Sequence, residues 1–322
     1  MQIVVEQGRS ATMRNVINDI SKKLLEALSE YKNGNFAGAY SFRQNGKCIG
    51  SKSSKNVEIT SKTDKQGIIV RVKPDTKGEV IFIPSCVTEG GIDDTVYNDF
   101  YVGENCDITI KSGCGVHTDD GSLAKHNGIH RFFVGENAKV HYEEKHIGTG
   151  KGEGIRSINP VSEVHLEKDA MLEINATQIS GIDKAYRKTT ATVAKGAKLN
   201  VHERLFTECS QVTKTNFKVE LNGEGSSADI VSRSVARDDS YQTMDSVIIG
   251  NAPCTGHSEC DSIVSENAIV DASPRLFARN PDASLIHEAA IGKIAGEQIL
   301  KLRTFGLTEE EAENEIIQGF LS

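Results

Sequence analysis

The chain has 322 residues, of which 38% are apolar and 25% charged, and its net charge is −8 at neutral pH. These proportions are ordinary for a globular protein, and the negative charge excludes an extensive electropositive surface for nucleic acid. No stretch approaches about 18 consecutive apolar residues and the start lacks the basic-then-apolar order of a signal peptide, so we expect a cytoplasmic protein without a membrane segment.

The first predicted element is a helix. Apolar residues recur at helical spacing, with charged residues between them, at Met13, Val16, Ile17, Ile20, Leu24 and Leu28. Asn33-Gly34 is a turn signal that ends this pattern. We therefore assign residues 1–34 to an N-terminal helical segment.

Helical periodicity is then absent for about 250 residues, and short runs of alternating apolar residues replace it. Valine, isoleucine and threonine dominate these runs, and glycine, asparagine, aspartate and lysine separate them. Because no helix pattern lies between the runs, a conventional βαβ sheet is excluded. A parallel β-helix and a β-propeller remain as alternatives.

Five segments share one pattern of a turn followed by a strand. They are VGENCDITI, VGENAKVHY, LEKDAMLEI, VAKGAKLNV and VSENAIV, which begin at Val102, Val134, Leu166, Val193 and Val264. Each has an Asn, Asp or Gly three residues after the first apolar residue, then a small residue, namely Cys106, Ala138, Ala170, Ala197 and Ala268. LNGEGSSADIV, from Leu221, is a looser copy.

These repeats are short and poor in aromatic residues, unlike propeller blades. A recurring unit that cannot bury its apolar face alone indicates stacked coils, in which the turn residue forms a tight corner and the small residue allows close stacking. The sequence therefore predicts a mainly β chain with a right-handed parallel β-helix over residues 35–284.

The C-terminal part, residues 285–322, is predicted to be a helical hairpin. An apolar stripe runs through His287–Phe305, and Gly306 ends it. Thr308 followed by Glu311 is a capping box for a second helix, on which Ala312, Ile316 and Phe320 lie four residues apart.

Seven cysteines are dispersed between Cys48 and Cys260. An odd and dispersed set does not indicate a disulfide scaffold, and in a reducing cytosol these residues are thiols. Most of them are expected to be small buried side chains, so a ligand role needs a separate argument for each.

Residues 258–321 resemble the C-terminal region of the SufB/SufD family. The motifs that carry the resemblance are Cys260-Asp261-Ser262, the stretch through Pro274, His287-Glu288-Ala289, Gly292-Lys293-Ile294, Phe305-Gly306-Leu307 and Gly319-Phe320. The resemblance is weaker through the β region and poor before about residue 40, where larger family members are longer. The chain resembles the compact archaeal or anaerobe form.

The resemblance implies a scaffold of a SUF-type complex that holds a transient iron–sulfur cluster at a homodimer interface and passes it to recipient apo proteins. It also implies an ABC-type ATPase partner, SufC-like, that grips the C-terminal hairpin. The chain has no phosphate-binding loop of its own. The glycine-rich segment Gly148–Gly154 has no hydroxyl residue after its lysine, so we interpret it as a flexible loop and expect no ATPase activity.

By the same resemblance, Cys260 and Glu288 match residues proposed to hold the cluster. Thiolate is the soft ligand that such clusters prefer, and a carboxylate is more easily displaced. The alternative places Cys260 in the β-helix interior and Glu288 at a helix start. His257 and His287 are further candidates. In one extended strand Cys254 and Cys260 share a face and His257 takes the other, unless a turn at Thr255-Gly256 breaks the alternation.

A second candidate site, for a metal, consists of Cys114, His117, His126 and His130. His141, His146, Glu143 and Glu144 lie nearby in the sequence. The spacing fits no structural zinc pattern, so ordinary surface or turn histidines are the alternative.

Two other functions remain open. The chain would have a SufD-like role if it recruited the ATPase without binding a cluster. A carbohydrate-active β-helix enzyme would need clustered carboxylates, but the most obvious acidic pairs, Asp119-Asp120 and Asp238-Asp239, have the character of turns.

Overall fold

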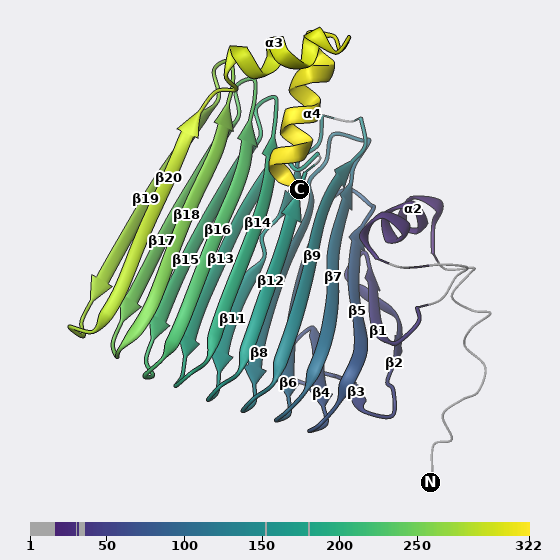
Figure 1. Cartoon of the computed structure of the whole chain (residues 1–322). Coiled ribbons are helices and arrows are strands. Elements are labelled where there is room, and N and C mark those ends of the chain that lie inside the picture. The colour runs from purple at the N-terminus through teal and green to yellow at the C-terminus, as the bar shows by residue number, and fades with distance from the viewer. Residues whose placement is uncertain (1–16, 30, 32–35, 152, 180) are drawn as a thin grey trace.

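The computed structural model describes residues 17–29, 31, 36–151, 153–179 and 181–322. In this part the chain is a parallel β-solenoid of two facing sheets, with helices on the outside (Figure 1). The predicted mainly β fold is confirmed, and the propeller is excluded. Met13, Val16 and the Asn33-Gly34 turn lie outside the described residues, whereas helix α2 spans Asp19–Leu28 as the pattern predicts.

Consecutive strands alternate between the two sheets. From edge to edge, the first sheet consists of β2 (Lys47–Lys52), β1 (Ala39–Gln44), β5 (Lys77–Val87), β7 (Asp107–His117), β9 (Lys139–Thr149), β12 (Met171–Gln178), β14 (Lys198–Thr207), β16 (Ser226–Ala236), β18 (Cys254–Val264) and β20 (Ala283–Gly292). The second sheet consists of β19 (Ile269–Ala278), β17 (Tyr241–Gly250), β15 (Val212–Leu221), β13 (Lys184–Val193), β10 (Arg156–Ile158), β8 (Ala124–Val134), β6 (Ile92–Val102), β4 (Gly67–Val72) and β3 (Val57–Ser61), with β11 (Val161–Leu166) between β8 and β13.

Only β1–β2 and β3–β4 pair antiparallel, at the N-terminal end. The remaining described pairs are parallel and form eight coils, from β4–β5 to β19–β20. Alternate residues of each strand point into the space between the sheets, which explains the period-two pattern of the sequence. Equivalent interior residues stack from coil to coil, as the rings of Phe100 and Phe132 do at 5.0 Å.

The interior also contains a buried polar row between the sheets, made of Asp94, His126, His130, Glu144, His146, Arg187 and Glu203. Asp94 accepts a hydrogen bond from Arg43 of β1, with 2.9 Å between Oδ1 and the guanidinium. The phenol of Tyr142 donates to Glu144, with 2.9 Å between the oxygens. Within this row the charged groups are paired, as buried charges must be if the fold is to be stable.

The predicted corners use left-handed residues. Asn105, Asn137, Asp169 and Gly196 have φ of 55°, 57°, 56° and 66°, and each lies between a second-sheet strand and the next first-sheet strand. The looser copy makes the same corner, with Gly225 at φ 72°. The repeat identified at Val264 is placed differently, because it connects β18 to β19 at the opposite corner. Its left-handed residue is Glu266 instead of Asn267.

This conformation gives a test of the corner assignment. Asn137→Val should destabilise the fold by about 1–2 kcal/mol, because a β-branched residue is strained at positive φ. Asn137→Gly should be nearly neutral, since glycine adopts this conformation without a steric cost. Thermal unfolding of the two variants would measure the difference. Equal losses would mean that an interaction of the Asn137 side chain matters more than its backbone.

Helix α2 covers the outer face of the first sheet near its N-terminal end (Figure 1). Asn18 caps the helix, because its side chain accepts a hydrogen bond from the Ser21 amide. Leu24 and Leu28 pack over Gly115 and Gly113 of β7, where a Cβ on Gly115 would lie 2.9 Å from Leu24 Cδ1. The two glycines therefore allow the helix to approach the sheet closely.

The C-terminal region differs from the prediction in its first part. The helix expected from His287 is a strand, β20, through Gly292, and helix α3 begins only at Gly296 and ends at Thr304. Ala283, Leu285, His287 and Ala289 alternate as in a strand and pair with β18, whereas the helical spacing of Ala290, Ile291 and Ile294 begins only after them.

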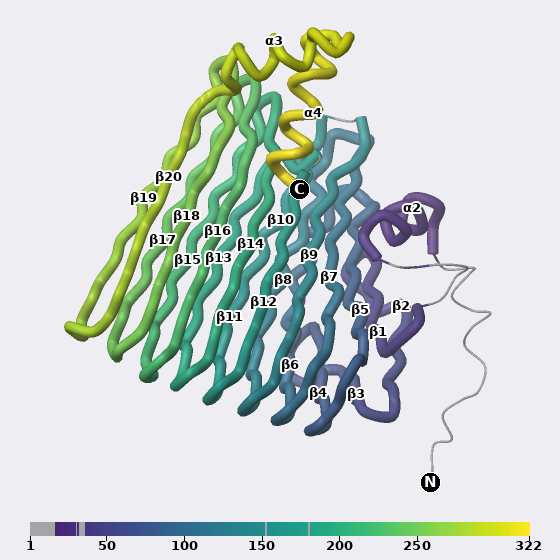
Figure 2. The backbone as a smooth tube through the Cα atoms, in the orientation of Figure 1, coloured from purple at the N-terminus to yellow at the C-terminus, as the bar shows by residue number. Residues whose placement is uncertain are grey.

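Helix α4 (Glu309–Leu321) begins with the predicted capping box of Thr308 and Glu311. It turns back over the first sheet (Figure 1), and Ala312 and Ile317 are its buried residues. Neither helix covers the last coil, and among the described strands none pairs with the outer edges of β19 and β20 (Figure 2). No helix in the described part of the chain is both long and apolar enough to cross a bilayer.

Candidate metal centre

Strand β18 carries most of the predicted ligands on two opposite faces. It runs without a turn at Thr255-Gly256, so the alternation of an extended strand holds through Val264. Cys254, Cys260 and the residues between them at even spacing are buried in the interior. His257 lies on the outer face of the first sheet.

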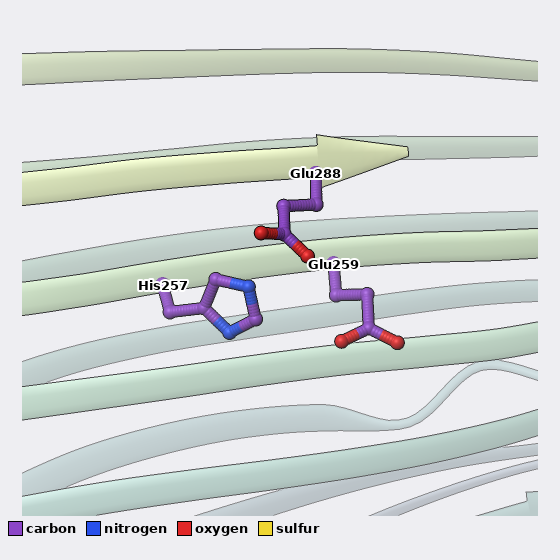
Figure 3. Close-up of side chains that lie close together, drawn as sticks. All are labelled: His257, Glu259 and Glu288. Atoms are coloured by element: carbon purple, nitrogen blue, oxygen red, sulfur yellow. The ribbon is translucent and has the colours of Figure 1, made fainter. Parts of the chain in front are cut away.

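On this outer face, His257 and Glu259 of β18 meet Glu288 of β20. Glu259 and Glu288 are direct neighbours across the two strands. One ligand atom from each of the three residues lies within 4.8 Å of the others, and Figure 3 shows the three side chains converging. We call these residues the outer group. In the described ranges no other set of three histidine, cysteine or carboxylate donors is this closely spaced.

The imidazole of His257 is oriented by Asp229 of the neighbouring strand β16. Its Nδ1 lies 2.8 Å from Asp229 Oδ1. This contact is best made by a protonated Nδ1, which leaves the lone pair on Nε2. In Figure 3 one ring nitrogen faces Glu288 and Glu259 and the other is turned away from them. The arrangement is that of a metal-binding histidine held by an outer carboxylate.

The carboxylates of this face are crowded. Partial burial and the nearby Asp261 raise the pKa of Glu259 above its usual range. Asp261 lies two residues after Glu259 on the same face, and Arg233 is the positive charge that lowers the repulsion. A bound cation would neutralise the same charge excess, so the electrostatics of the outer group are compatible with a metal.

Cys260 lies on the other side of the strand. Its side chain is buried in the interior and is adjacent to Ser232 of β16 and Ala289 of β20 in the strand register. Its Sγ is 3.9 Å from Ser262 Oγ. Burial, together with the negative charge of Glu203, raises the pKa of the thiol, so Cys260 is protonated at neutral pH without a metal.

His287 shares the inward face with Cys260. Its Nδ1 donates to the carbonyl oxygen of Ser258 at 2.9 Å. The ring is half-buried, because β20 is an edge strand of the first sheet in the described part of the chain. The Nε2 atom therefore remains available for a ligand at the open end of the solenoid.

The four predicted cluster ligands thus lie on opposite faces of strands β18 and β20. His257 and Glu288 lie outside, whereas Cys260 and His287 lie inside. The alternative interpretation of Cys260 as an interior residue is confirmed, but Glu288 is in a strand and not at a helix start. Sequence reasoning missed Glu259, although its spacing of two from His257 is the signal that places both on one face of a strand.

The second predicted site is not assembled as one ligand group. His126 contacts Asp94 at 3.0 Å and His130 contacts the Tyr142 hydroxyl at 2.7 Å, both in the polar row. His117 lies outside at a corner, between Thr149 and Asp119. Together with the buried Cys114 they form no three-donor group within the described residues. Each histidine instead has a separate structural partner.

The acidic pairs are also structural. Asp120 accepts hydrogen bonds from Ser122 and Thr118 in a corner loop, and Asp238 is itself a left-handed corner residue with φ 57°. Both pairs lie between strands, at corners of the solenoid and not on a coil face. These geometries give no support to a carbohydrate-active enzyme.

Comparison with known proteins identifies similar sequences. The family model of the SufBD core domain, described as SUF system FeS cluster assembly, matches residues 98–320. An iron–sulfur cluster assembly SufBD family protein of Archaeoglobus fulgidus is 31% identical over 261 residues, which is 80% of this chain and 69% of the relative. One from Methanothermobacter thermautotrophicus is 30% identical over 80% of this chain and 62% of its own length. One from Methanocaldococcus jannaschii is 31% identical over 73% of this chain and 74% of the relative.

Proposed function

Because this chain belongs to the SufBD family of iron–sulfur cluster assembly proteins, we propose that it is the scaffold subunit of a SUF-type complex. In this proposal it is not an enzyme but holds a transient cluster, its cargo, and releases it to recipient apo proteins. The observation that supports the proposal best is the concentration of donors on β18 and β20. These strands carry the outer group on one face and Cys260 and His287 on the other.

The proposed dimer interface is the open end of the solenoid. No described strand pairs with the outer edges of β19 and β20, and Ile269 and Ile286 are 57% and 53% exposed. Free edges pair readily with another chain, and a second copy could cover both the edges and the apolar side chains. Such a homodimer would place Glu288 and His287 of each copy next to the partner, where a cluster could be shared.

The proposed energy source is an ABC-type ATPase resembling SufC, docked on α3 and α4. On this helical pair the large apolar side chains of Leu300 and Phe305 are 62% and 76% exposed. Exposed apolar side chains of this size are typical of a surface that binds another protein. Only residues 293–295 separate helix α3 from the end of β20, one of the two strands that carry the donors (Figure 1). Movement of the bound ATPase would therefore act on the end of the solenoid that holds the cargo.

A SufD-like role is the second candidate, and the position of Cys260 favours it. The thiol is buried and faces away from the outer group, so the two kinds of ligand do not converge within one chain. In this role the chain would recruit the ATPase and bind no cluster by itself.

Anaerobic reconstitution with Fe²⁺ and sulfide separates the two roles. A scaffold should develop visible charge-transfer absorbance, and Cys260→Ala should lose most of it, because thiolate is the preferred cluster ligand. Cys86→Ala is the matched control, since Cys86 is equally buried but lies under α2 at the opposite end. Equal absorbance from Cys260→Ala and wild type would contradict the ligand role. Absence of a cluster in wild-type protein that still binds the ATPase would support the SufD-like role.

A further inference from the structure

We propose that the outer group, His257, Glu259 and Glu288, is a mononuclear site for ferrous iron that takes up the ion without Cys260. The identity of the metal rests on the proposed function, whereas the site itself rests on the geometry of β18 and β20. The inference separates uptake of the ion, on nitrogen and oxygen donors, from binding of the cluster on sulfur.

The donor set selects the class of metal. One imidazole and two carboxylates suit Fe²⁺, Mn²⁺ and Zn²⁺, whereas thiolate and thioether ligands select Cu⁺ and preformed clusters. The triad of non-haem ferrous oxygenases has two histidines and one carboxylate, and the outer group, with one histidine and two carboxylates, offers the same nitrogen and oxygen donors. Three protein donors leave room for water, so sulfide or a thiolate can later enter the coordination sphere.

The backbone holds the donors in place before any ion binds. His257 and Glu259 are two residues apart on one strand and thus share a face. Glu288 is the direct register partner of Glu259 on β20. All three residues belong to regular strands and none to a loop, which favours a preorganised site.

The contact between Asp229 and His257 supports a metal role more directly. A solvent-exposed histidine needs no fixed tautomer, but a ligand histidine does. The 2.8 Å contact at Nδ1 directs Nε2 to the two glutamates (Figure 3). By contrast, His141 on the same face of the sheet has a single carboxylate partner, Glu173, at 3.2 Å and lacks a third donor.

Position also separates the site from the thiol. Cys260 follows Glu259 directly and therefore points to the opposite side of the sheet. Its nearest strand neighbours are Ser232 and Ala289, and neither belongs to the outer group. Uptake of iron on the outer face should therefore be independent of Cys260.

The experiment is an anaerobic titration of the intact apo protein with Fe²⁺ in the absence of sulfide, followed by competition with a chelating dye. We expect one ion per chain. Glu288→Gln and His257→Ala should each weaken binding at least about tenfold, and Asp229→Asn should weaken it by about 10–100-fold through the loss of histidine orientation. Cys260→Ala and the control His141→Ala should bind as wild type does.

Co²⁺ provides a second readout that identifies the donors. The outer group should give weak visible d–d bands without the intense near-ultraviolet sulfur-to-cobalt band of a thiolate site. A strong sulfur band, loss of binding in Cys260→Ala, or wild-type affinity in both His257→Ala and Glu288→Gln would overturn the proposal. Circular dichroism of each variant would show that the β-solenoid is retained.

The outcome is distinguishable from failure of the proposed function. If wild-type protein assembles a cluster but binds no Fe²⁺ in the absence of sulfide, the outer group is not an iron site and the scaffold role stands. If Fe²⁺ binds with the expected variant pattern but no cluster assembles, the iron site stands and the scaffold role is wrong.

Discussion

Replacing Arg187 by methionine should lower the free energy of unfolding by about 3–5 kcal/mol. Arg187 lies fully inside the solenoid between two carboxylates, with its guanidinium 2.5 Å from Glu144 and its Nε 3.1 Å from Glu203. Burial opposes ionisation of Glu144, but the charge of Arg187 is the main effect that outweighs it and holds the pKa of Glu144 well below its usual range. Without Arg187 a buried carboxylate would lose its main counter-charge.

Urea unfolding followed by circular dichroism would measure this loss. Lys188→Met is the matched control, because Lys188 is the next residue of the same strand but is exposed, and its replacement should change stability by less than about 0.5 kcal/mol. Adding Glu144→Gln and Glu203→Gln to Arg187→Met should recover much of the stability, since the uncompensated charges are then gone. Equal stability of Arg187→Met and the control would mean that water reaches the polar row.

Stability should also fall by about 3 kcal/mol between about pH 6.5 and pH 4 because of His130 alone. Burial lowers the pKa of His130 from 6.5 to about 4. In this window the unfolded chain takes up a proton at His130 and the folded chain does not, so acid favours unfolding. Burial lowers the pKa of His146 as well, which adds to the effect with the same sign.

Unfolding free energies at about pH 7.5, 5.5 and 4.5 would show this slope. His130→Gln should flatten the dependence, because glutamine does not titrate. His165→Gln is the control, since His165 is exposed on the second sheet and its loss should leave the slope unchanged. The buried carboxyl groups of Asp94 and Glu144 have lowered pKa values, so their protonation contributes at lower pH. Burial raises the pKa of Glu203, so this group acts with the opposite sign, and only the difference between wild type and His130→Gln isolates His130. An identical slope in wild type and His130→Gln would contradict the assignment.

The solenoid could be predicted because its corners require a special backbone conformation that few residues adopt. Asn105, Asn137 and Asp169 indicate these corners in the sequence, and all three have positive φ in the structure. At Val264 the same pattern was assigned to the wrong corner. Left-handed residues followed by small ones occur at both corners of a coil, so the pattern alone does not distinguish the two corners. The strand at His287 was missed because the helical spacing of Ala290, Ile291 and Ile294 was extended back over it, although this segment alternates as a strand and pairs with β18.

The candidate site could be predicted in part. The alternation of a strand already separates His257 from Cys260 and joins it to Glu259. What the sequence could not supply is the register between strands one coil apart, which brings Glu288 opposite Glu259. The buried pairing of Arg187 with Glu144 and Glu203 could not be predicted either. In the sequence, a charged residue that faces the interior cannot be distinguished from one that faces solvent.

The stacking of coils also implies an order of folding. Each parallel strand pairs only with strands of the coil before and the coil after it, so every ladder joins segments about one coil apart. The solenoid can thus grow coil by coil during synthesis, from the end covered by α2. Glu288 can reach His257 and Glu259 only when β20 has left the ribosome and paired with β18. The candidate iron site is therefore completed late, on a body that is already folded.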